Sequence, residues 1–391
     1  MFADYPDEKG YFGKFGGCFT PEILMQYMLD LDRAYSFYKN NTAFQQEFKQ
    51  LLETHAGRET PLFLAENLGD HNSGARIFLK REDLTTTGSH HINSALGQAL
   101  LARKMGKSLL IAETSTGLHG IAVAKAAAVM DMNCQVFIGV ADCSRQPNCV
   151  GQIRALGAEV SIVEPGHSSL LEANAEANRA WLGALKNCFY VANSVVGPHP
   201  YPVMARDFQS LIGLEVKQQL LSATGRYPDH LVACLGGGSN AMGLFYPFLD
   251  TTIAMTCVEA AGSNGRHAAR FRDGRSGIYQ GVKTIMLQDS VGHLLNGHSL
   301  AVGLQSTLVG PEPSFLQVAG RLSYETISDR EALHAYQLTR GLESITPALE
   351  RAHAIAWGLK LAATLNPDNN IVINLSGQGK KDASQIPVAF Q

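Results

Sequence analysis

The chain has 391 residues, of which 45% are hydrophobic and 17% charged, and its formal net charge is −3. This length favours two α/β domains of ordinary size with a cleft between them. The charge balance offers no basic face for nucleic acid, and no apolar run approaches the roughly 20 residues that a bilayer requires. The first residues lack the order of a signal peptide. We therefore expect a compact cytoplasmic protein that binds neither nucleic acid nor membrane.

The seven cysteines are scattered along the chain, odd in number and without a C-x-x-C pair. A disulfide framework and a structural zinc site both require paired cysteines at short, regular spacing. We expect these cysteines to be reduced and several of them to lie in the core.

The first half of the chain settles into alternating strand and helix patterns. Residues 21–53 carry apolar side chains at helical spacing, and residues 61–64 and 75–80 are predicted to be short strands. Apolar runs of strand length then alternate with segments of helical pattern, which is typical of β-α-β units and a mainly parallel sheet. The predicted strands of this series are 109–113, 135–139, 160–164 and 189–193, and 120–132 is one of the predicted helices.

A second alternating series follows, with predicted strands at 231–235, 253–259 and 371–375 and amphipathic helices at 333–343 and 348–365. Residues 260–325 have weak periodicity and many Gly, Ser and His residues, so we expect an irregular segment near the cleft. The predicted fold class is α/β, with two doubly wound three-layer domains and the active site between them. The expected division is 1–55 plus 90–200, with a mobile cleft-closing part, and 56–89 plus 201–391, which carries a glycine-rich loop.

That loop, Gly236-Gly237-Gly238-Ser239-Asn240, follows a predicted strand and precedes a predicted helix. A glycine-rich turn at this position presents free backbone N–H groups that bind an anion such as phosphate. Glycine also lets the backbone approach the ligand closely because it has no Cβ. The pattern is neither G-x-G-x-x-G nor a P-loop, so nicotinamide dinucleotides and nucleoside triphosphates are disfavoured. A tight turn without a ligand is the alternative.

Several motifs occur in the order and at the spacing of one known family. Together they resemble the β chain of tryptophan synthase, a fold-type II pyridoxal-phosphate enzyme. The resemblance implies that family's fold and its reaction, in which serine is dehydrated to an aminoacrylate and indole is added at Cβ. It also implies a homodimer, with a possible α-type subunit. The motifs are LKREDL at 79–84, GQALLA at 97–102, VGPHP at 196–200, RDFQS at 206–210, PALE at 347–350, AHA at 352–354 and NLSG at 374–377.

One residue departs from the family pattern at its reactive position. The family sequence Thr-Gly-Ala-His-Lys-Ile-Asn corresponds to Thr-Gly-Ser-His-His-Ile-Asn at 87–93, so His91 stands where the resemblance places the Schiff-base lysine. Imidazole has no primary amine and cannot form that imine, although it can transfer protons near neutral pH. No other lysine obviously replaces it, because Lys80, Lys283 and the Lys380-Lys381 pair belong to other motifs. Pyridoxal phosphate is therefore expected to bind non-covalently at most, and another phosphate-bearing ligand remains possible.

Two further positions implied to bind substrate also differ. The family's Gly-Ala-Gly-Gln-His-Gly loop, which grips the substrate carboxylate, is replaced by a loop in which Leu118 removes an amide. The family's aspartate that accepts the substrate hydroxyl becomes Gln305, and a neutral amide cannot act as a charged acceptor. The loop residues expected to contact substrate are Ser115, Thr116, Gly117, Leu118 and His119.

Other site residues match the family. The resemblance assigns Glu113 to proton transfer and indole activation, and assigns Ser376 to the pyridine nitrogen. Glu350 and His90 are expected beside the cofactor. Three of these residues also have a simpler structural interpretation. Glu113 could be a polar residue at a strand end, Glu350 a carboxylate on the face of a helix, and Ser376 a residue that caps the next helix.

His91 is either a filler left after catalysis was lost or a new acid or base that works with Glu113. A metal site from His90, His91 and His119 is disfavoured, because adjacent histidines on one helix are expected to point apart. Two functions of different class remain. The first is a repurposed enzyme that acts without a Schiff base on an indole-like or phosphorylated small molecule; the second is a non-catalytic β-like binding or regulatory subunit. An ordinary β-replacement lyase that makes tryptophan is a third.

Overall fold

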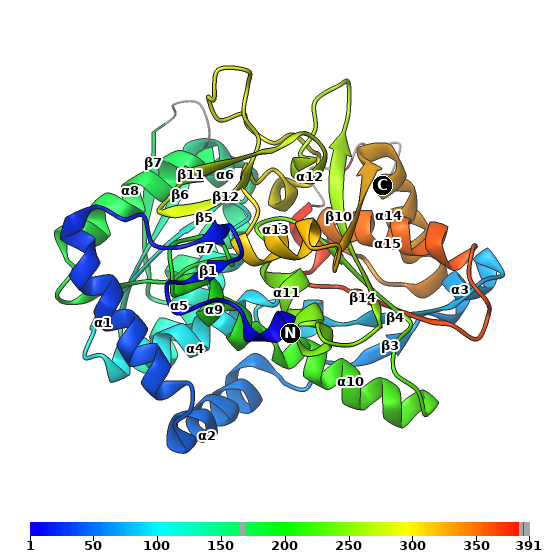
Figure 1. Cartoon of the computed structure of the whole chain (residues 1–391), viewed down its shortest axis with the longest axis horizontal. Helices are drawn as coiled ribbons and strands as arrows, with labels where there is room; N and C mark the ends of the chain where they lie inside the picture. Colours follow the sequence, from blue (N-terminus) through cyan, green and yellow to red (C-terminus); the bar gives the residue numbers. More distant parts are fainter. Residues whose placement is uncertain (165–168, 383–385, 387–391) are drawn as a thin grey trace.

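The computed structural model describes residues 1–164, 169–382 and 386. Its larger sheet has six strands in the order β13-β10-β9-β14-β4-β3 (Figure 1). All neighbours pair in parallel except β3 and β4. Both faces of such a sheet are covered, so its central strands β4, β9, β10 and β14 are buried along nearly their whole length. The strands are β3 Leu62–Leu64, β4 Arg76–Lys80, β9 His230–Cys234, β10 Ala254–Gly262, β13 Ser323–Ser328 and β14 Asn370–Asn374.

The smaller sheet has four parallel strands in the order β7-β6-β5-β8. With the larger sheet it confirms the predicted α/β class with two parallel-sheet units. The strands of this sheet all lie within residues 109–190, while those of the larger sheet come from 62–80 and 230–374; the domain boundaries given above stay a prediction. The strands are β5 Leu109–Thr114, β6 Asn133–Gly139, β7 Glu159–Val163 and β8 Cys188–Tyr190.

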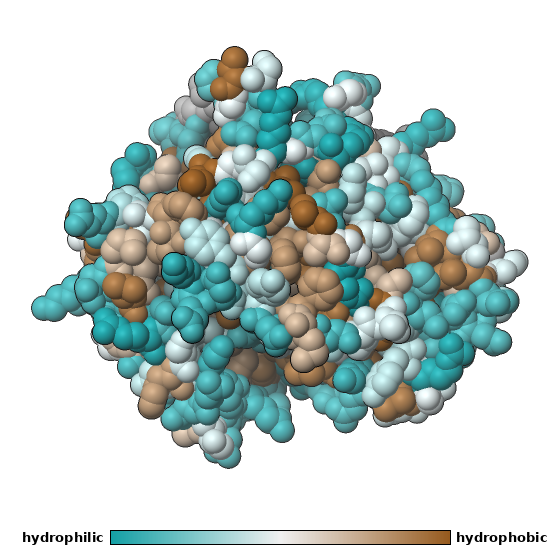
Figure 2. Space-filling view, viewed as in Figure 1, coloured by the Kyte–Doolittle hydropathy of each residue, from teal (hydrophilic) through white to brown (hydrophobic). Residues whose placement is uncertain are grey.

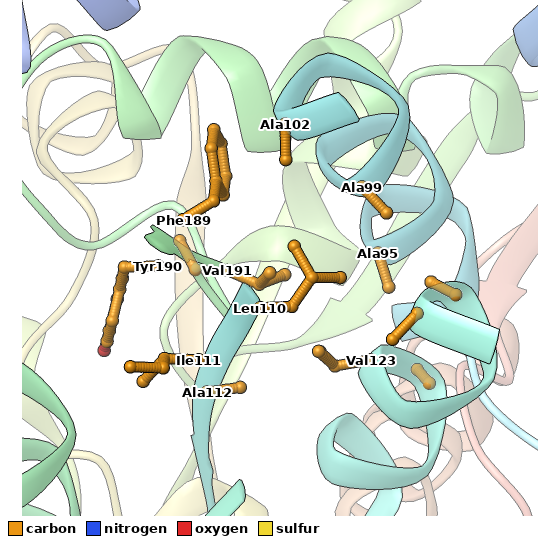
Figure 3. Packing of buried hydrophobic residues seen from close by; sticks show 14 of the residues in the cluster. Ala95, Ala99, Ala102, Leu110, Ile111, Ala112, Val123, Phe189, Tyr190 and Val191 are labelled. Atoms are coloured by element: carbon orange, nitrogen blue, oxygen red, sulfur yellow. The ribbon is translucent and has the colours of Figure 1, made fainter. Parts of the chain in front are cut away.

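Two apolar helices cover one face of the smaller sheet. Ala95, Ala99 and Ala102 lie on one side of α4 at the i, i+4, i+7 spacing of a buried helical stripe. Figure 3 shows these alanines facing Leu110, while Tyr190 extends on the other side of the strands. Small side chains let the helix approach the sheet closely and leave the opposite face for the site described below. The helices of this unit are α4 His91–Lys104, α5 Leu118–Met130, α6 Val140–Arg145, α7 Pro147–Ala155 and α8 Ser169–Gly183.

The helices around the larger sheet include the two predicted amphipathic ones. The helix predicted at 333–343 begins earlier, because Ser328 and Glu331 form a capping box: the Glu331 N–H donates to the Ser328 hydroxyl, and the Ser328 N–H donates to the Glu331 carboxylate. The helices are α3 Glu66–Asn72, α9 Tyr201–Gln209, α10 Leu211–Thr224, α11 Ser239–Phe245, α13 Pro311–Val318, α14 Asp329–Glu343 and α15 Leu349–Ala362.

The prediction of an irregular segment at 260–325 is wrong in part. The segment holds α12 Arg270–Asp273 and the antiparallel hairpin of β11 Arg275–Tyr279 and β12 Val282–Met286. This hairpin pairs with β1 Tyr11–Phe12 and β2 Phe15–Gly16 in a third sheet, where Lys283 lies opposite Gly16. Strands as short as β1 and β2 give little periodicity, and these partners of the hairpin lie far away from it in the chain.

The predicted helical stretch 21–53 is divided into α1 Glu22–Tyr38, α2 Thr42–Leu51 and a π-helical turn Leu52–Ala56. Asn41 separates the first two because its side chain accepts a hydrogen bond from the Phe44 N–H at 3.0 Å and caps α2. On the face seen in Figure 2, charged and apolar residues are interspersed. None of the described helices is long and apolar enough to span a bilayer.

Candidate active site

Two adjoining cavities lie where the parallel strands end. The loop after β5, the glycine-rich loop after β9 and the segment after β14 all contribute, as expected for the carboxyl edge of α/β sheets. The loop cavity, of about 120 Å³, is bounded by the glycine-rich loop, His91 and Lys381. The aromatic cavity, of about 640 Å³, is bounded by Glu113, Trp181 and Gln280. The residues that line both are Ser115, Leu170, Asn193, Ser194, Val302 and Ser306.

The glycine-rich loop presents unpaired backbone donors to the loop cavity. Among the described residues, none accepts a hydrogen bond from the N–H of Gly236, Gly237 or Gly238, and the three glycines line the cavity. Gly238 has a φ of 117°, which L side chains rarely adopt. Buried N–H groups are otherwise almost always paired, so three of them in one turn form a cradle for an anion.

His90 joins the glycine-rich loop to the end of β14. Its Nδ1 lies 2.9 Å from the carbonyl oxygen of Ser376, which can only accept, so Nδ1 carries the proton. Nε2 then accepts from the Ser239 hydroxyl at 3.1 Å. Burial lowers the pKa of His90 to about 4, and the Arg351 charge acts in the same direction. A neutral imidazole therefore fixes the hydroxyl at the start of the anion cradle.

His91 and His119 lie beside His90 in the same cavity. The His91 ring is 4.2 Å from that of His90 and 5.5 Å from that of His119, so the expectation that adjacent histidines point apart is wrong. His90 precedes the first residue of α4, and helical geometry does not yet separate the two side chains. The Nδ1 of His91 hydrogen-bonds the Ser89 hydroxyl at 3.1 Å. Burial lowers the pKa of His91 well below its ordinary value, with the neighbouring histidines acting in the same direction.

One ring nitrogen of His119 is buried without a hydrogen-bond partner among the described residues. Its Nε2 donates to the Val191 carbonyl oxygen at 3.1 Å, while its Nδ1 is buried with no hydrogen-bond partner. Burial lowers the pKa of His119 to about 4, so this Nδ1 is an acceptor. Within the described part of the chain, no group of three or more His, Cys, Asp or Glu residues has the arrangement of a metal site.

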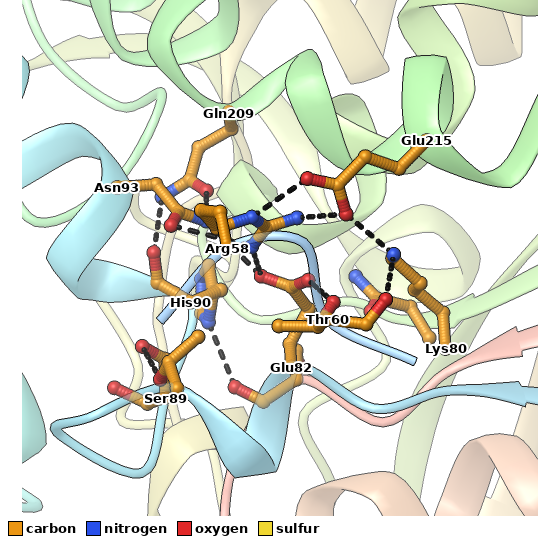
Figure 4. A network of polar contacts seen from close by, with 12 residues as sticks. Arg58, Thr60, Lys80, Glu82, Ser89, His90, Asn93, Gln209 and Glu215 are labelled. Carbon is orange, nitrogen blue, oxygen red and sulfur yellow. Dashed lines mark hydrogen bonds and ion pairs between the residues drawn. The ribbon is translucent and has the colours of Figure 1, made fainter. Parts of the chain in front are cut away.

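A buried network sets the position of the first turn of α4 (Figure 4). The Asn93 amide donates to Glu82 at 3.0 Å, and the Gln209 amide donates to the His90 carbonyl oxygen at 3.0 Å. Glu82 in turn accepts from Arg58 at 2.6 Å. The two histidines are thus held by a rigid polar support beneath them.

Part of the lining of the loop cavity is charged. The Lys381 Nζ lies 3.0 Å from both carboxylate oxygens of Glu350 and 2.5 Å from Asp382. The Arg351 Nε donates to the Ser376 hydroxyl at 2.8 Å. Arg351 and Lys381 line the cavity, whereas the fully buried Ser376 lines neither described cavity.

Two expectations need correction here. Lys381 belongs to a separate motif in the sequence, yet its side chain shares a cavity with His91. Ser376, expected to face the ligand, lines neither described cavity, and its hydroxyl accepts a hydrogen bond from Arg351. Attraction to Asp382 and Glu350 raises the pKa of Lys381 despite its burial, so the amine is held protonated.

Two backbone N–H groups of the loop after β5 donate hydrogen bonds to side chains of the same loop. The Gly117 N–H donates to the Thr114 hydroxyl at 3.1 Å, and the Leu118 N–H donates to the Thr116 hydroxyl at 3.4 Å. Ser115, Thr116, Leu118 and His119 line the loop cavity, while Gly117 does not. The number of backbone donors available to a substrate carboxylate is therefore smaller than the sequence suggests.

Glu113 is the last residue but one of β5 and lines the aromatic cavity. The Tyr190 hydroxyl donates to one carboxylate oxygen at 2.5 Å, and the Asn193 amide donates to the other at 2.9 Å. Burial raises the pKa of Glu113, although the Tyr190 hydroxyl and the Asn174 amide oppose the shift. The Trp181 ring lies 5.4 Å from that of Tyr190, and the Tyr201 ring lies 6.1 Å from Tyr190 and 6.4 Å from Trp181. A buried carboxyl group thus faces an aromatic wall.

Gln305 also lies in the aromatic cavity, where its amide donates to the Ser299 carbonyl oxygen at 2.7 Å. Arg145 lines the same cavity and forms an ion pair with Asp142. This pairing gives Arg145 a structural role.

The structure brings nearly all the predicted residues to these two cavities, with Ser376 just behind Arg351 and Gly117 behind its loop. Sequence reasoning missed Arg351, Lys381, Tyr190 and Asn193. Arg351 directly follows the predicted Glu350 and Lys381 lies five residues after Ser376, so proximity in sequence was an available indication. Nothing local marked Tyr190 or Asn193.

Comparisons with known proteins agree with this architecture. A family model described as "Pyridoxal-phosphate dependent enzyme" matches residues 53–377. The crystal structure of a fungal L-serine ammonia-lyase from Rhizomucor miehei superposes with a TM-score of 0.63 at 19% identity, covering 82% of this chain and 93% of that one. The crystal structure of a T.th. threonine deaminase gives a TM-score of 0.64 at 22% identity, covering 90% of this chain and 98% of that one. At these identities the two structures show a common fold.

Proposed function

Because the chain belongs to the family of pyridoxal-phosphate-dependent enzymes, we propose that it is a repurposed, tryptophan synthase β-like member that acts without a Schiff base. Its substrate is an indole-like or phosphorylated small molecule. The observation that carries the proposal is the position of His91, which shares the loop cavity with three unpaired glycine N–H groups and has no amine. An anion cradle without a neighbouring free amine supports binding of a phosphate group without covalent attachment.

The residues fit one part of pyridoxal phosphate and not another. The glycine N–H groups and Ser239 suit its phosphate. His91 cannot form the imine, Ser376 lines neither described cavity, and the protonated Lys381 amine is tied to carboxylates. Only an unprotonated amine can attack an aldehyde, so covalent attachment is disfavoured.

The proposed chemistry is acid–base catalysis by His91 and Glu113, in an addition or elimination reaction. Neutral His91 accepts a proton at the ring nitrogen that does not contact Ser89. Glu113, whose pKa burial raises, holds or releases a proton in the adjoining aromatic cavity. Ser115 and Asn193 border both cavities, so a substrate can reach both groups.

The first test is an absorbance spectrum with and without added pyridoxal phosphate, followed by mass analysis after borohydride reduction. We expect binding without an imine band and without a reduced adduct. An adduct would contradict the proposal and support an ordinary β-replacement lyase. Peptide mapping of the reduced protein, compared with that of the Lys381→Met variant, then shows whether the adduct is attached to Lys381.

A second candidate is a non-catalytic binding or regulatory subunit. It is favoured by the saturation of Glu113, both of whose carboxylate oxygens already accept hydrogen bonds. His91→Ala separates the two candidates, because it abolishes turnover of an acid–base enzyme and leaves ligand binding by a regulatory subunit intact. The homodimer, an α-type partner and a cytoplasmic location remain parts of the proposal; light scattering tests the first two.

A further inference from the structure

A chain of hydrogen bonds crosses the wall of the aromatic cavity and ends at Glu113. The Gln280 amide donates to the Asn174 side-chain oxygen at 2.7 Å, and the Asn174 amide donates to the Tyr190 hydroxyl at 2.8 Å. Tyr190 then donates to Glu113 at 2.5 Å. All four residues line the cavity, and every donor in the chain points towards the carboxylate.

The residues of this chain come from separate parts of the fold. Glu113 lies on β5, Tyr190 ends β8, Asn174 lies on α8, and Gln280 lies in the turn between β11 and β12. Gln280 has a φ of 50°, which is uncommon for a residue other than glycine. The third sheet thus carries an amide into the aromatic cavity, at the end of the chain away from Glu113.

Asn178 adds a second amide at that far end. It lies one helical turn after Asn174 on α8, and its Nδ2 donates to the Asn174 side-chain and backbone oxygens at 3.0 and 2.9 Å. The described residues supply no hydrogen-bond partner for the Oδ1 of Asn178 or the Oε1 of Gln280, and both residues line the cavity. Among the described residues, the second amide N–H of Gln280 also has no acceptor, so two acceptors and one donor remain at this end.

We propose that the aromatic cavity takes a flat ring whose edge away from Glu113 carries a hydrogen-bond donor, such as a hydroxyl group, and that Asn178 and Gln280 recognise this group. The inference rests on the proposed function, since it names the substrate class for the same cavity. An unsubstituted ring would cover these acceptors without pairing them. A site built to pair a hydroxyl group discriminates strongly against the analogue that lacks it.

The test is calorimetric binding of two probes, indole and 5-hydroxyindole, to the full chain. We expect 5-hydroxyindole to bind about tenfold more tightly. Asn178→Leu, which keeps the side-chain size and favours helix, should abolish that preference. Gln280→Asn, which tolerates a positive φ but is shorter, should reduce the preference. Gln26→Leu, an exposed change on α1, is the matched control.

The inference would be overturned if the two probes bound equally well, if indole bound more tightly, or if neither probe bound. It would also be overturned if Asn178→Leu kept the preference for 5-hydroxyindole. Binding of pyridoxal phosphate is measured on the same samples. Retained phosphate-ligand binding with no ring preference rejects this inference alone. Absence of any phosphate-bearing ligand rejects the proposed function instead.

Discussion

Two buried clusters of this protein contain the same set of charges, two cations and two carboxylates, in different surroundings. The sealed cluster lies beneath the start of α4 and lines neither described cavity (Figure 4). In the cavity cluster, three of the four members border the loop cavity. The sealed cluster is Arg58, Lys80, Glu82 and Glu215; the cavity cluster is Glu350, Arg351, Lys381 and Asp382.

The comparison shows that the same set of charges can support a helix in one place and line a ligand cavity in another. Burial opposes ionisation of Glu82, but Arg58 and Lys80 hold its pKa at about 2. Glu350 behaves alike, with Lys381 and Arg351 as the cations. In the sealed cluster this pairing only supports the helix that carries His91. In the cavity cluster it fixes Arg351 and Lys381 at a surface that a ligand can touch.

The largest effect is expected from breaking the sealed cluster. Arg58→Met leaves Glu82 and Glu215 without their shared partner in a region closed to water, and should lower the free energy of unfolding by about 3–5 kcal/mol. Chemical denaturation measures the loss. Arg33→Met, which removes an exposed ion pair with Asp30, is the control and should cost less than about 1 kcal/mol. Equal losses would contradict the distinction between sealed and exposed pairs.

Breaking the cavity cluster should cost less. Lys381→Met removes the amine from Glu350 and Asp382, but Arg351 still lies 3.2 Å from Glu350 and water can enter from the cavity. We expect a loss of about 2 kcal/mol in the free energy of unfolding, because the carboxylates keep partial compensation. Chemical denaturation of both variants, Lys381→Met and Arg58→Met, compares the two losses of unfolding free energy. An equal loss would show that access to the cavity does not reduce the cost of the unpaired carboxylates.

The buried histidines should make the protein sensitive to acid. His119 has a pKa of about 4 in the folded chain, and about 6.5 is usual for an unfolded one. Between these values the unfolded state binds more protons, so the stability is fully present above about pH 6.5 and is lost as the pH falls towards 4. This histidine alone should cost about 2 kcal/mol at about pH 5.

His119→Gln should remove that part of the acid sensitivity. Denaturation at about pH 7 and about pH 5 measures it, with His334→Gln, an exposed change on α14, as the control. A variant that loses as much stability as the unaltered protein between these two pH values would show that His119 protonates in the folded state.

The smallest effect is expected at the glycine-rich loop. A Cβ on Gly237 would lie 2.6 Å from the Cβ and Oγ of Ser194, so Gly237→Ala must displace the loop and its N–H groups. Binding of pyridoxal phosphate, measured by calorimetry, should weaken about tenfold, or about 1.4 kcal/mol. Gly341→Ala, where a Cβ meets nothing within 4 Å, is the control. An unchanged affinity would place the phosphate elsewhere.

Local pattern sufficed for much of the fold and site. Strand-length apolar runs predicted the two parallel sheets, and the glycine-rich loop lies between its strand and helix as expected. The third sheet escaped prediction, because β1 and β2 have only two residues each and β2 meets β12 only through Gly16 and Lys283. Lys381 follows the predicted Ser376 closely, but its position beside His91 depends on a contact between distant segments.

The sequence by itself determined the strand–helix alternation of the two parallel sheets, the α/β class and the presence of histidine at position 91, since each is written in local residue types. Tertiary structure alone decided that Arg351 donates to the Ser376 hydroxyl and that Lys381 shares a cavity with His91. It also decided that Gln280 reaches Asn174. These contacts join residues from distant segments. Their distances and their burial, and therefore their pKa values and partners, exist only once the chain has folded.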